Sequence, residues 1–520
     1  MKSRKVNSMK SIMTSLAYNF IKIIIQFIFR SLFIHYLSIT YLGVNSAVAS
    51  LLNLLSVTEL GISSVITFNL YKPVADNDTE KINSIIKFYR NVYIVIGVVI
   101  LIIGLMCIPF LDILIKDYDS VNVNIRLVYL LSLLSTVVSY FCSYRTVLFI
   151  AYQEQYKINL LNTILYIFNV ALKISAVTIF KNYYIYLIVV FVTTIIDNIL
   201  VYLYSKKVYP EVSLKDTKTL SLEDKSQISK NIKGMVYHKL SSVILQATDS
   251  IIISSFIGVT ILGVYSNYSI FTTNLIMIFS VVCSAMVGSI GNLMVNSEKD
   301  KPYEVYKYLK LGCFWFAGFC AICLFVLLNP TITLWAKFSK WDNSINWTLN
   351  TFTVFIICLN FYIYSSRIIT GTFRECLGMF EKDRFKGIIE AAINLIVSMM
   401  LVKPLGIAGI LIGTIVSCMC TSIWVDPYMV YKYKFKKSLS KHFIDLIFYT
   451  IVTLVAGVLT YYICSLIPHS TFLWYCVKVF VCILIPNIVF LIAYFKTNEF
   501  KNIVKIIKGV LKNKKAIKEV

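Results

Sequence analysis

Residues 91–111 read NVYIVIGVVILIIGLMCIPFL and contain no charged side chain. About 20 predominantly apolar residues in a helix cross the hydrocarbon core of a bilayer. Similar stretches recur along the 520 residues, which are 58% hydrophobic and 15% charged, whereas a soluble domain carries roughly 25% charged residues. Because a spanning helix satisfies its own backbone hydrogen bonds, the sequence predicts an all-α polytopic membrane protein.

Apolar runs between charged or Pro- and Gly-marked breaks predict about fourteen transmembrane helices. Their limits are 11–37, 43–70, 91–111, 127–150, 158–180, 183–205, 234–257, 262–294, 311–329, 350–372, 387–402, 405–430, 443–466 and 471–495. Of the 50 Lys and Arg residues, 37 fall in segments assigned to the cytoplasm and six in segments assigned outside. This bias predicts two cytoplasmic termini. It also accounts for the net charge of +24 without a nucleic-acid partner.

The two halves of the chain repeat short segments in the same order. Residues 41–44 (YLGV) correspond to 261–264 (ILGV), residues 143–145 to 365–367, and residues 155–157 to 384–386. Such offsets predict two six-helix lobes that are parallel repeats about an axis along the membrane normal, a transporter arrangement. We expect an N-terminal lobe over 1–205, a cytoplasmic linker over 206–233, a C-terminal lobe over 234–430, two additional helices over 431–495 and a basic cytoplasmic tail over 496–520.

The sequence carries no motif for metal binding or hydrolysis. Most of the thirteen cysteines lie in apolar runs, where Cys behaves as a small hydrophobe. Cys320 and Cys323 form a CxxC pair, but a structural zinc site needs four ligands and no second pair accompanies them. No Gly-Lys dipeptide occurs, which excludes a Walker A loop. We therefore expect a protein that is not an enzyme and holds no cofactor, with transport driven by H⁺ or Na⁺, by the membrane potential or by the substrate gradient.

A polar stripe runs along the first predicted span. Ser15, Asn19, Lys22, Gln26 and Arg30 are spaced by four, three, four and four residues, which places them within about 80° of a helix circumference. Charges at the bilayer centre are costly and usually face a cavity or a partner. Two cations without an acid in the stripe favour a water-filled cavity. Helix packing through interhelical hydrogen bonds is the alternative.

The fifth predicted span repeats this pattern with Asn162, Tyr166, Asn169 and Lys173. The predicted spans of the first half contain more cations than acids. The cations are Lys22, Arg30, Arg145 and Lys173, and the acids are Glu59 and Asp197. This balance favours an anionic substrate over a metal ion or a cationic drug.

Other ionisable residues are candidates for coupling or gating. In the seventh predicted span, His238 and Asp249 share one helical face, and an intramembrane pair of this kind is either an ion site or a structural contact. Glu59 and Glu390 are the acids that could join them. Arg145 and Arg367 lie near the cytoplasmic ends of their spans, either as gate cations or as side chains that extend towards the interface.

Several segments resemble a known family. They are Thr58–Ser64 (TELGISS), Asn69–Pro73 (NLYKP), Tyr237–Leu240 (YHKL) and Thr248-Asp249. With the Leu-Gly-Val segments of the second and eighth spans, they resemble the bacterial Wzx-type polysaccharide repeat-unit flippases of the multidrug/oligosaccharidyl-lipid/polysaccharide (MOP) exporter superfamily. The resemblance implies a MATE-like fold, with a central cavity that opens alternately to either side of the plasma membrane. Two helices beyond twelve resemble the lipid II flippase branch, where they form a groove for a polyprenyl tail.

The family resemblance also implies a substrate. It implies that undecaprenyl-diphosphate-linked oligosaccharide moves from the inner to the outer leaflet, beside a polysaccharide polymerase and glycosyltransferases. Lys22, Arg30, Lys173 and Lys239 would then attract the diphosphate. Asn19, Gln26 and Asn169 would contact sugar hydroxyls. The alternatives are an ion-coupled multidrug exporter, a lipid II-type flippase, and a membrane scaffold or glycosyltransferase subunit.

Overall fold

The structure is a computed structural model. It describes residues 2–56, 62–118, 121, 123–214, 219–296, 300–342, 344–378, 383, 385–468, 471–505 and 508, with only the backbone described for some helical residues, including 230–242. The chain divides into two compact units. Unit 1 comprises residues 1–266 with the short segments 339–342 and 402–406, and unit 2 comprises the rest. The division into lobes, linker and tail expected from the sequence stays a prediction.

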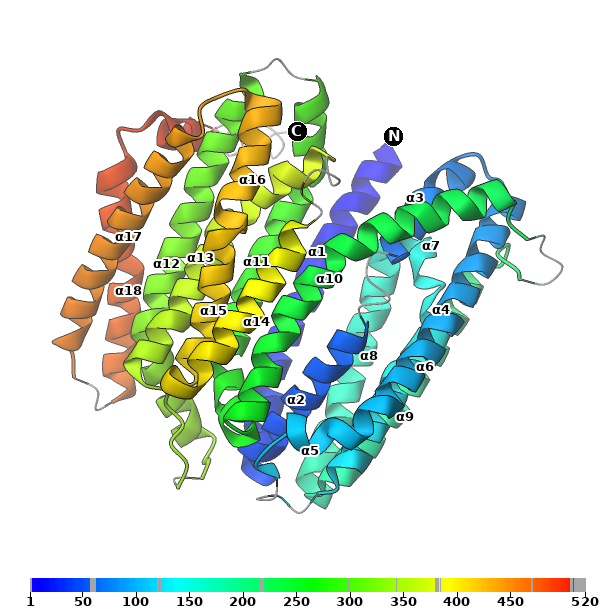
Figure 1. Cartoon of the computed structure of the whole chain (residues 1–520), viewed down its shortest axis with the longest axis horizontal. Coiled ribbons are helices and arrows are strands. Elements are labelled where there is room, and N and C mark those ends of the chain that lie inside the picture. The colour runs from blue at the N-terminus through cyan, green and yellow to red at the C-terminus, as the bar shows by residue number, and fades with distance from the viewer. Residues whose placement is uncertain are drawn as a thin grey trace, which may run out of the picture. The chain divides into compact units, whose positions relative to one another are not determined.

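Unit 1 is built from helices in its described part (Figure 1). They are α1 (Lys2–Tyr36), α2 (Ile39–Leu55), α3 (Ile62–Ala75), α4 (Thr79–Cys107), η2 (Ile108–Phe110), α5 (Leu111–Leu114), α6 (Ile125–Ser143), α7 (Thr146–Ala151), α8 (Gln155–Ser175), η4 (Ala176–Phe180), α9 (Tyr183–Val208), α10 (Leu222–Phe256) and the start of α11 (Val259–Asn296). Within this unit α1 packs against α8, α6 against α9, and α10 against α2.

The remainder of α11 opens unit 2. The helices that follow are α12 (Lys301–Phe338), α13 (Thr351–Cys376), α14 (Lys386–Leu405), α15 (Ile407–Cys420), α16 (Ser422–Val430), η5 (Tyr431–Phe435), α17 (Ser440–Ser465) and α18 (Phe472–Tyr494). Helices α17 and α18 pack against each other and against α12, as Figure 1 shows.

The predicted fold class is confirmed. In the described residues, eleven helices are long and apolar enough to cross a membrane, and eleven of the fourteen predicted spans lie in them. The other three predicted spans correspond to α2 with α3, α6 with α7, and the end of α10. Large apolar side chains such as Val458 and Leu473 are about 70% exposed. Because water would oppose such exposure, these faces are suited to lipid.

Some predicted spans are divided in the structure. The span predicted over 127–150 breaks at Tyr144 and Arg145, between α6 and α7. The span predicted over 405–430 breaks at Thr421, whose φ of −130° and ψ of −82° are not helical. Hydropathy does not reveal such breaks, because the residues around them are as apolar as those of a continuous helix.

The two Leu-Gly-Val segments contact each other. A Cβ atom on Gly43 would lie 1.8 Å from the carbonyl oxygen of Val259, and one on Gly263 would lie 2.5 Å from that of Ile39. One turn away, the hydroxyls of Thr40 and Thr260 are hydrogen-bonded at 3.0 Å. Glycine is therefore required at both positions for the first turns of α2 and α11 to approach this closely.

Candidate functional site

The polar stripe on α1 ends at a buried arginine. Arg30 is 8% exposed, while Asn19, Lys22 and Gln26 are half-buried. The Nη2 atom of Arg30 donates to the hydroxyl of Ser266 on α11. Its Nε atom is buried without a hydrogen-bond partner, and no described acid forms an ion pair with Arg30. A desolvated cation with only a hydroxyl beside it is costly, so the site is suited to an anion.

The second polar stripe, which lies on α8, is on a helix that packs against α1. The rings of Tyr18 on α1 and Tyr166 on α8 meet edge to face, with centroids 6.1 Å apart. Further along α8, buried Asn169 donates to the carboxylate of Asp197 on α9. Lys173 lies within electrostatic range of that carboxylate. The structure therefore places the polar stripe of α8 against α1 at Tyr18 and against Asp197, an acid that the sequence alone left without a partner.

Arg145 is hydrogen-bonded to the end of α9 and to the residues that follow it. It is buried, and its Nε atom donates to the hydroxyl of Ser205 at 3.2 Å. Its Nη1 and Nη2 atoms donate to the carbonyl oxygens of Val212 and Tyr209, at 3.2 and 3.3 Å. In this structure all three nitrogen atoms of the guanidinium are thus engaged with neutral protein groups. The gating role expected for Arg145 stays a prediction.

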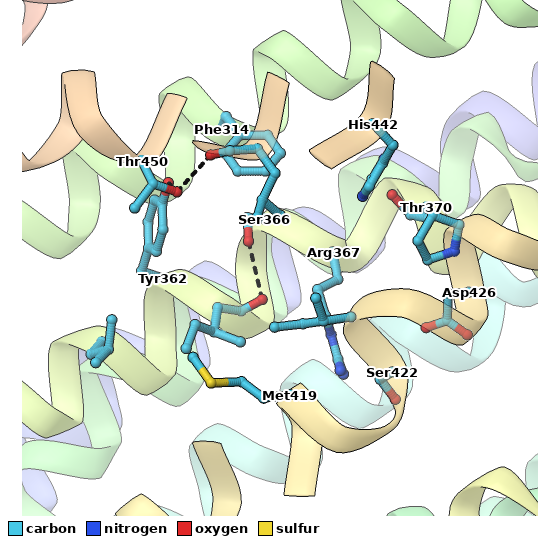
Figure 2. Close-up of a pocket in the computed structure, with 15 residues that line it drawn as sticks. Phe314, Tyr362, Ser366, Arg367, Thr370, Met419, Ser422, Asp426, His442 and Thr450 are labelled. Carbon is cyan, nitrogen blue, oxygen red and sulfur yellow. Dashed lines mark hydrogen bonds between the residues drawn. The ribbon is translucent and has the colours of Figure 1, made fainter. Parts of the chain in front are cut away.

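Arg367 lines a cavity of about 170 Å³ in unit 2, between α13, α16 and α17. Figure 2 shows Arg367, Ser422 and Asp426 towards one end of this cavity and Tyr362 and Thr450 towards the other. The last two residues are hydrogen-bonded through their hydroxyls at 3.0 Å. The cavity therefore has a charged end and a neutral end.

The charges around this cavity are paired. The guanidinium of Arg367 lies 3.8 Å from buried Glu390, which also accepts a hydrogen bond of 2.6 Å from Ser422. Asp426 lies 3.6 Å from Arg374 and forms an ion pair with Lys386. Among these described residues each cation has a carboxylate nearby, in contrast to Arg30.

The remaining predicted residues are described only in part. Asp249 is half-buried on α10, within electrostatic range of Tyr265. Glu59 lies outside the described residues, as do the side chains of His238 and Lys239. The structure therefore does not test the proposed coupling set, which stays a prediction.

The sequence profile of a family described as polysaccharide biosynthesis protein matches residues 8–290. The chain belongs to the polysaccharide biosynthesis protein family. The match spans α1 to α11 and includes both polar stripes, Arg30 and Ser266. The resemblance stated from the sequence is thus confirmed at the level of the family. No curated protein sequence matches the chain.

Three solved structures of this fold resemble the chain, each at 13 or 14% sequence identity. The lipid II flippase MurJ in an inward closed conformation matches with a TM-score of 0.67 and 13% identity, over 93% of this chain and 98% of its own. An inward-facing MATE family multidrug transporter of the MOP superfamily gives 0.63 and 13%, over 81% and 98%. A mutant of VcmN, a MATE transporter from Vibrio cholerae, gives 0.58 and 14%, over 84% and 99%.

These matches establish the fold of this chain. It is a multi-pass membrane protein with the MATE/MurJ-like fold. The solved structures that share this fold are themselves described as multidrug transporters or as a lipid II flippase. Sequence reasoning found Arg30 and the two stripes, but it could not find Ser266, which lies 236 residues from Arg30 along the chain.

Proposed function

We propose that this protein is a flippase for a lipid-linked oligosaccharide. It moves an undecaprenyl-diphosphate-linked repeat unit from the inner to the outer leaflet of a bacterial plasma membrane by alternating access. Both of its termini are cytoplasmic, as the distribution of Lys and Arg predicts. Its family, described as polysaccharide biosynthesis protein, and its transporter fold support this proposal.

The observation that carries the proposal is the environment of Arg30. Buried Lys310 has a carboxylate partner, Asp445, and the partly buried Arg374 has Asp383. Buried Arg145 has no carboxylate partner among the described residues, but all three of its guanidinium nitrogens donate to neutral oxygens. Arg30 has the hydroxyl of Ser266 instead. A guanidinium binds phosphate through two parallel N–H···O bonds, so a diphosphate would supply the charge and the acceptors that Arg30 lacks.

Lys22 is the second cation of this diphosphate site. It lies eight residues before Arg30 on the same face of α1, about 12 Å along the helix axis. It is half-buried, and no described acid forms an ion pair with it. Such a cation attracts the headgroup at long range, while Arg30 makes the directional contact.

The proposal is tested by polysaccharide export in cells that depend on this protein. Arg30→Ala should abolish export and cause lipid-linked repeat units to accumulate at the inner leaflet. Arg30→Lys should retain part of the activity, because an ammonium group replaces the charge but not the bidentate hydrogen bonding of the guanidinium. Arg126→Ala, which removes an exposed arginine from a surface ion pair, is the control and should export normally. Normal export by Arg30→Ala at wild-type protein levels would overturn the proposal.

Coupling to an ion gradient is a separate part of the proposal. Asp249→Asn keeps the shape of the side chain and removes its charge. If Asp249 couples transport to H⁺ or Na⁺, this variant should lose the dependence of flipping on pH or sodium in vesicles and still bind the substrate. An unchanged pH and sodium profile would exclude Asp249 as the coupling residue.

A further inference from the structure

A second polar cluster lies in unit 1, away from Arg30, where α1, α8 and α9 pack together. At its centre is Asp197 of α9, whose Oδ2 atom accepts a hydrogen bond from Asn169. The Oδ1 atom of the same carboxylate is buried and has no hydrogen-bond partner among the described residues. A buried acceptor without a donor is costly, so this atom is suited to a ligand that brings one.

One aromatic ring lies near this carboxylate, and a second ring packs against the first. Tyr18 lies within electrostatic range of Asp197 and meets the ring of Tyr166 edge to face. Both rings are half-buried. They offer an apolar face together with hydroxyl groups that donate or accept.

The charges of the cluster indicate the class of ligand. The carboxylate of Asp197 and the ammonium of Lys173 lie within electrostatic range of each other, so together they carry no net charge. A metal ion would be repelled by Lys173 and a second anion by Asp197. A neutral molecule with many hydroxyls satisfies both groups at once, and its C–H face can lie against the tyrosine rings.

We propose that Tyr18, Tyr166, Asn169, Lys173 and Asp197 form a subsite for a sugar ring of the transported oligosaccharide. This inference rests on the proposed function and adds a second contact region to it. The free Oδ1 atom of Asp197 accepts from a sugar hydroxyl, and Lys173 donates to a sugar oxygen. Asn169 orients the carboxylate through its hydrogen bond to Oδ2.

The position of the cluster on α1 separates it from Arg30, which makes the directional contact with the diphosphate. Tyr18 precedes Arg30 by 12 residues, which corresponds to about 18 Å along the axis of α1. This distance exceeds the reach of a diphosphate and its first sugar. A ligand that extends from Arg30 to Tyr18 therefore needs further sugar rings, and the subsite distinguishes a complete repeat unit from a truncated one.

The test compares two probes on the purified full-length protein. One is undecaprenyl diphosphate, which has no sugar, and the other is the lipid-linked repeat unit extracted from cells that lack the polymerase. Asp197→Asn should weaken binding of the repeat unit about tenfold and leave the Kd of undecaprenyl diphosphate unchanged. Arg30→Ala should weaken binding of both probes. Asp112→Asn, a change at an exposed acid, is the control and should affect neither.

A second variant guards against effects on folding. Tyr166→Leu keeps an apolar side chain and removes the ring and its hydroxyl, so it should reproduce the selective loss. Equal weakening of both probes by Asp197→Asn and Tyr166→Leu, or no change in either variant, would overturn the subsite. Failure of the wild-type protein to bind either probe would instead overturn the proposed function, and the subsite with it.

Discussion

The contact between α2 and α11 gives a prediction whose size follows from the structure. In Gly43→Ala the new Cβ would lie 1.8 Å from the carbonyl oxygen and 2.6 Å from the carbonyl carbon of Val259. Carbon atoms in contact are normally about 3.5 to 4 Å apart, so the two backbones must separate by roughly 1.5 Å. Both groups belong to helix backbones and cannot rotate away as a side chain can.

Overpacking of this kind costs about 1 to 3 kcal/mol, and a backbone clash belongs at the upper end. The separation also weakens the bond between Thr40 and Thr260, which contributes about 1 kcal/mol. We expect a loss of about 3 kcal/mol in the free energy of unfolding. For a unit of this size that corresponds to a fall in Tm of about 6 to 12 °C.

Thermal denaturation of the purified protein measures this effect, with Gly312→Ala as the matched control. Gly312 is also a helical glycine, on α12, but no heavy atom lies within 4 Å of the position of an added Cβ. Replacing it should leave the Tm unchanged or raise it slightly, since alanine favours a helix over glycine. Equal Tm values for the Gly43 variant and wild type would refute the close approach of α2 and α11.

Three further predictions concern other parts of the chain. Lys310 is 1% exposed and lies 3.1 Å from Asp445. Asp445→Asn should therefore lower the free energy of unfolding by about 1 to 3 kcal/mol, and Lys310→Met combined with Asp445→Leu should recover most of this loss. No recovery in the double variant would contradict the ion-pair explanation. The hydrogen bond to Lys437 lowers the pKa of Asp300 below its usual 3.8 and raises that of Lys437. The ion pair is thus present at neutral pH and is lost as the pH falls through the pKa of Asp300. The Tm of wild type should therefore differ from that of Asp300→Asn at neutral pH, and the difference should vanish in acid. A difference that persists in acid would argue against this ion pair. In a protein without native cysteines, Ser344→Cys should react with an impermeant thiol reagent from outside and Lys218→Cys should not; the reverse labelling would overturn the predicted topology.

The sequence predicted the fold class because each span carries its own signal. A run such as 91–111 is apolar enough to be recognised without any neighbour, and α4 includes most of it. The break at Thr421 was missed because the residues on both sides remain apolar and only the backbone angles change. Hydropathy therefore predicts where a membrane-spanning segment lies, but not where its helix is interrupted.

Side-chain partners were beyond the reach of the sequence. The spacing of Lys22 and Arg30 predicted a common helical face, since that depends only on the 3.6-residue repeat. The contact of Arg30 with Ser266 and that of Asn169 with Asp197 join different helices, and no local pattern encodes them. Likewise, the repeated Leu-Gly-Val segments indicated a duplication, but only the structure shows Gly43 and Gly263 in contact.

The central claim is that the protein carries a diphosphate-linked oligosaccharide across the bilayer by means of Arg30. Reconstitution into vesicles that contain the fluorescently labelled lipid-linked repeat unit tests it directly, with accessibility of the sugar to an impermeant glycosidase as the readout. Wild-type protein should expose repeat units from the inner leaflet to the enzyme, whereas vesicles that contain Arg30→Ala, or no protein, should protect them. Equal protection in all three preparations would contradict the flippase assignment, and equal exposure by wild type and Arg30→Ala would contradict the role of Arg30.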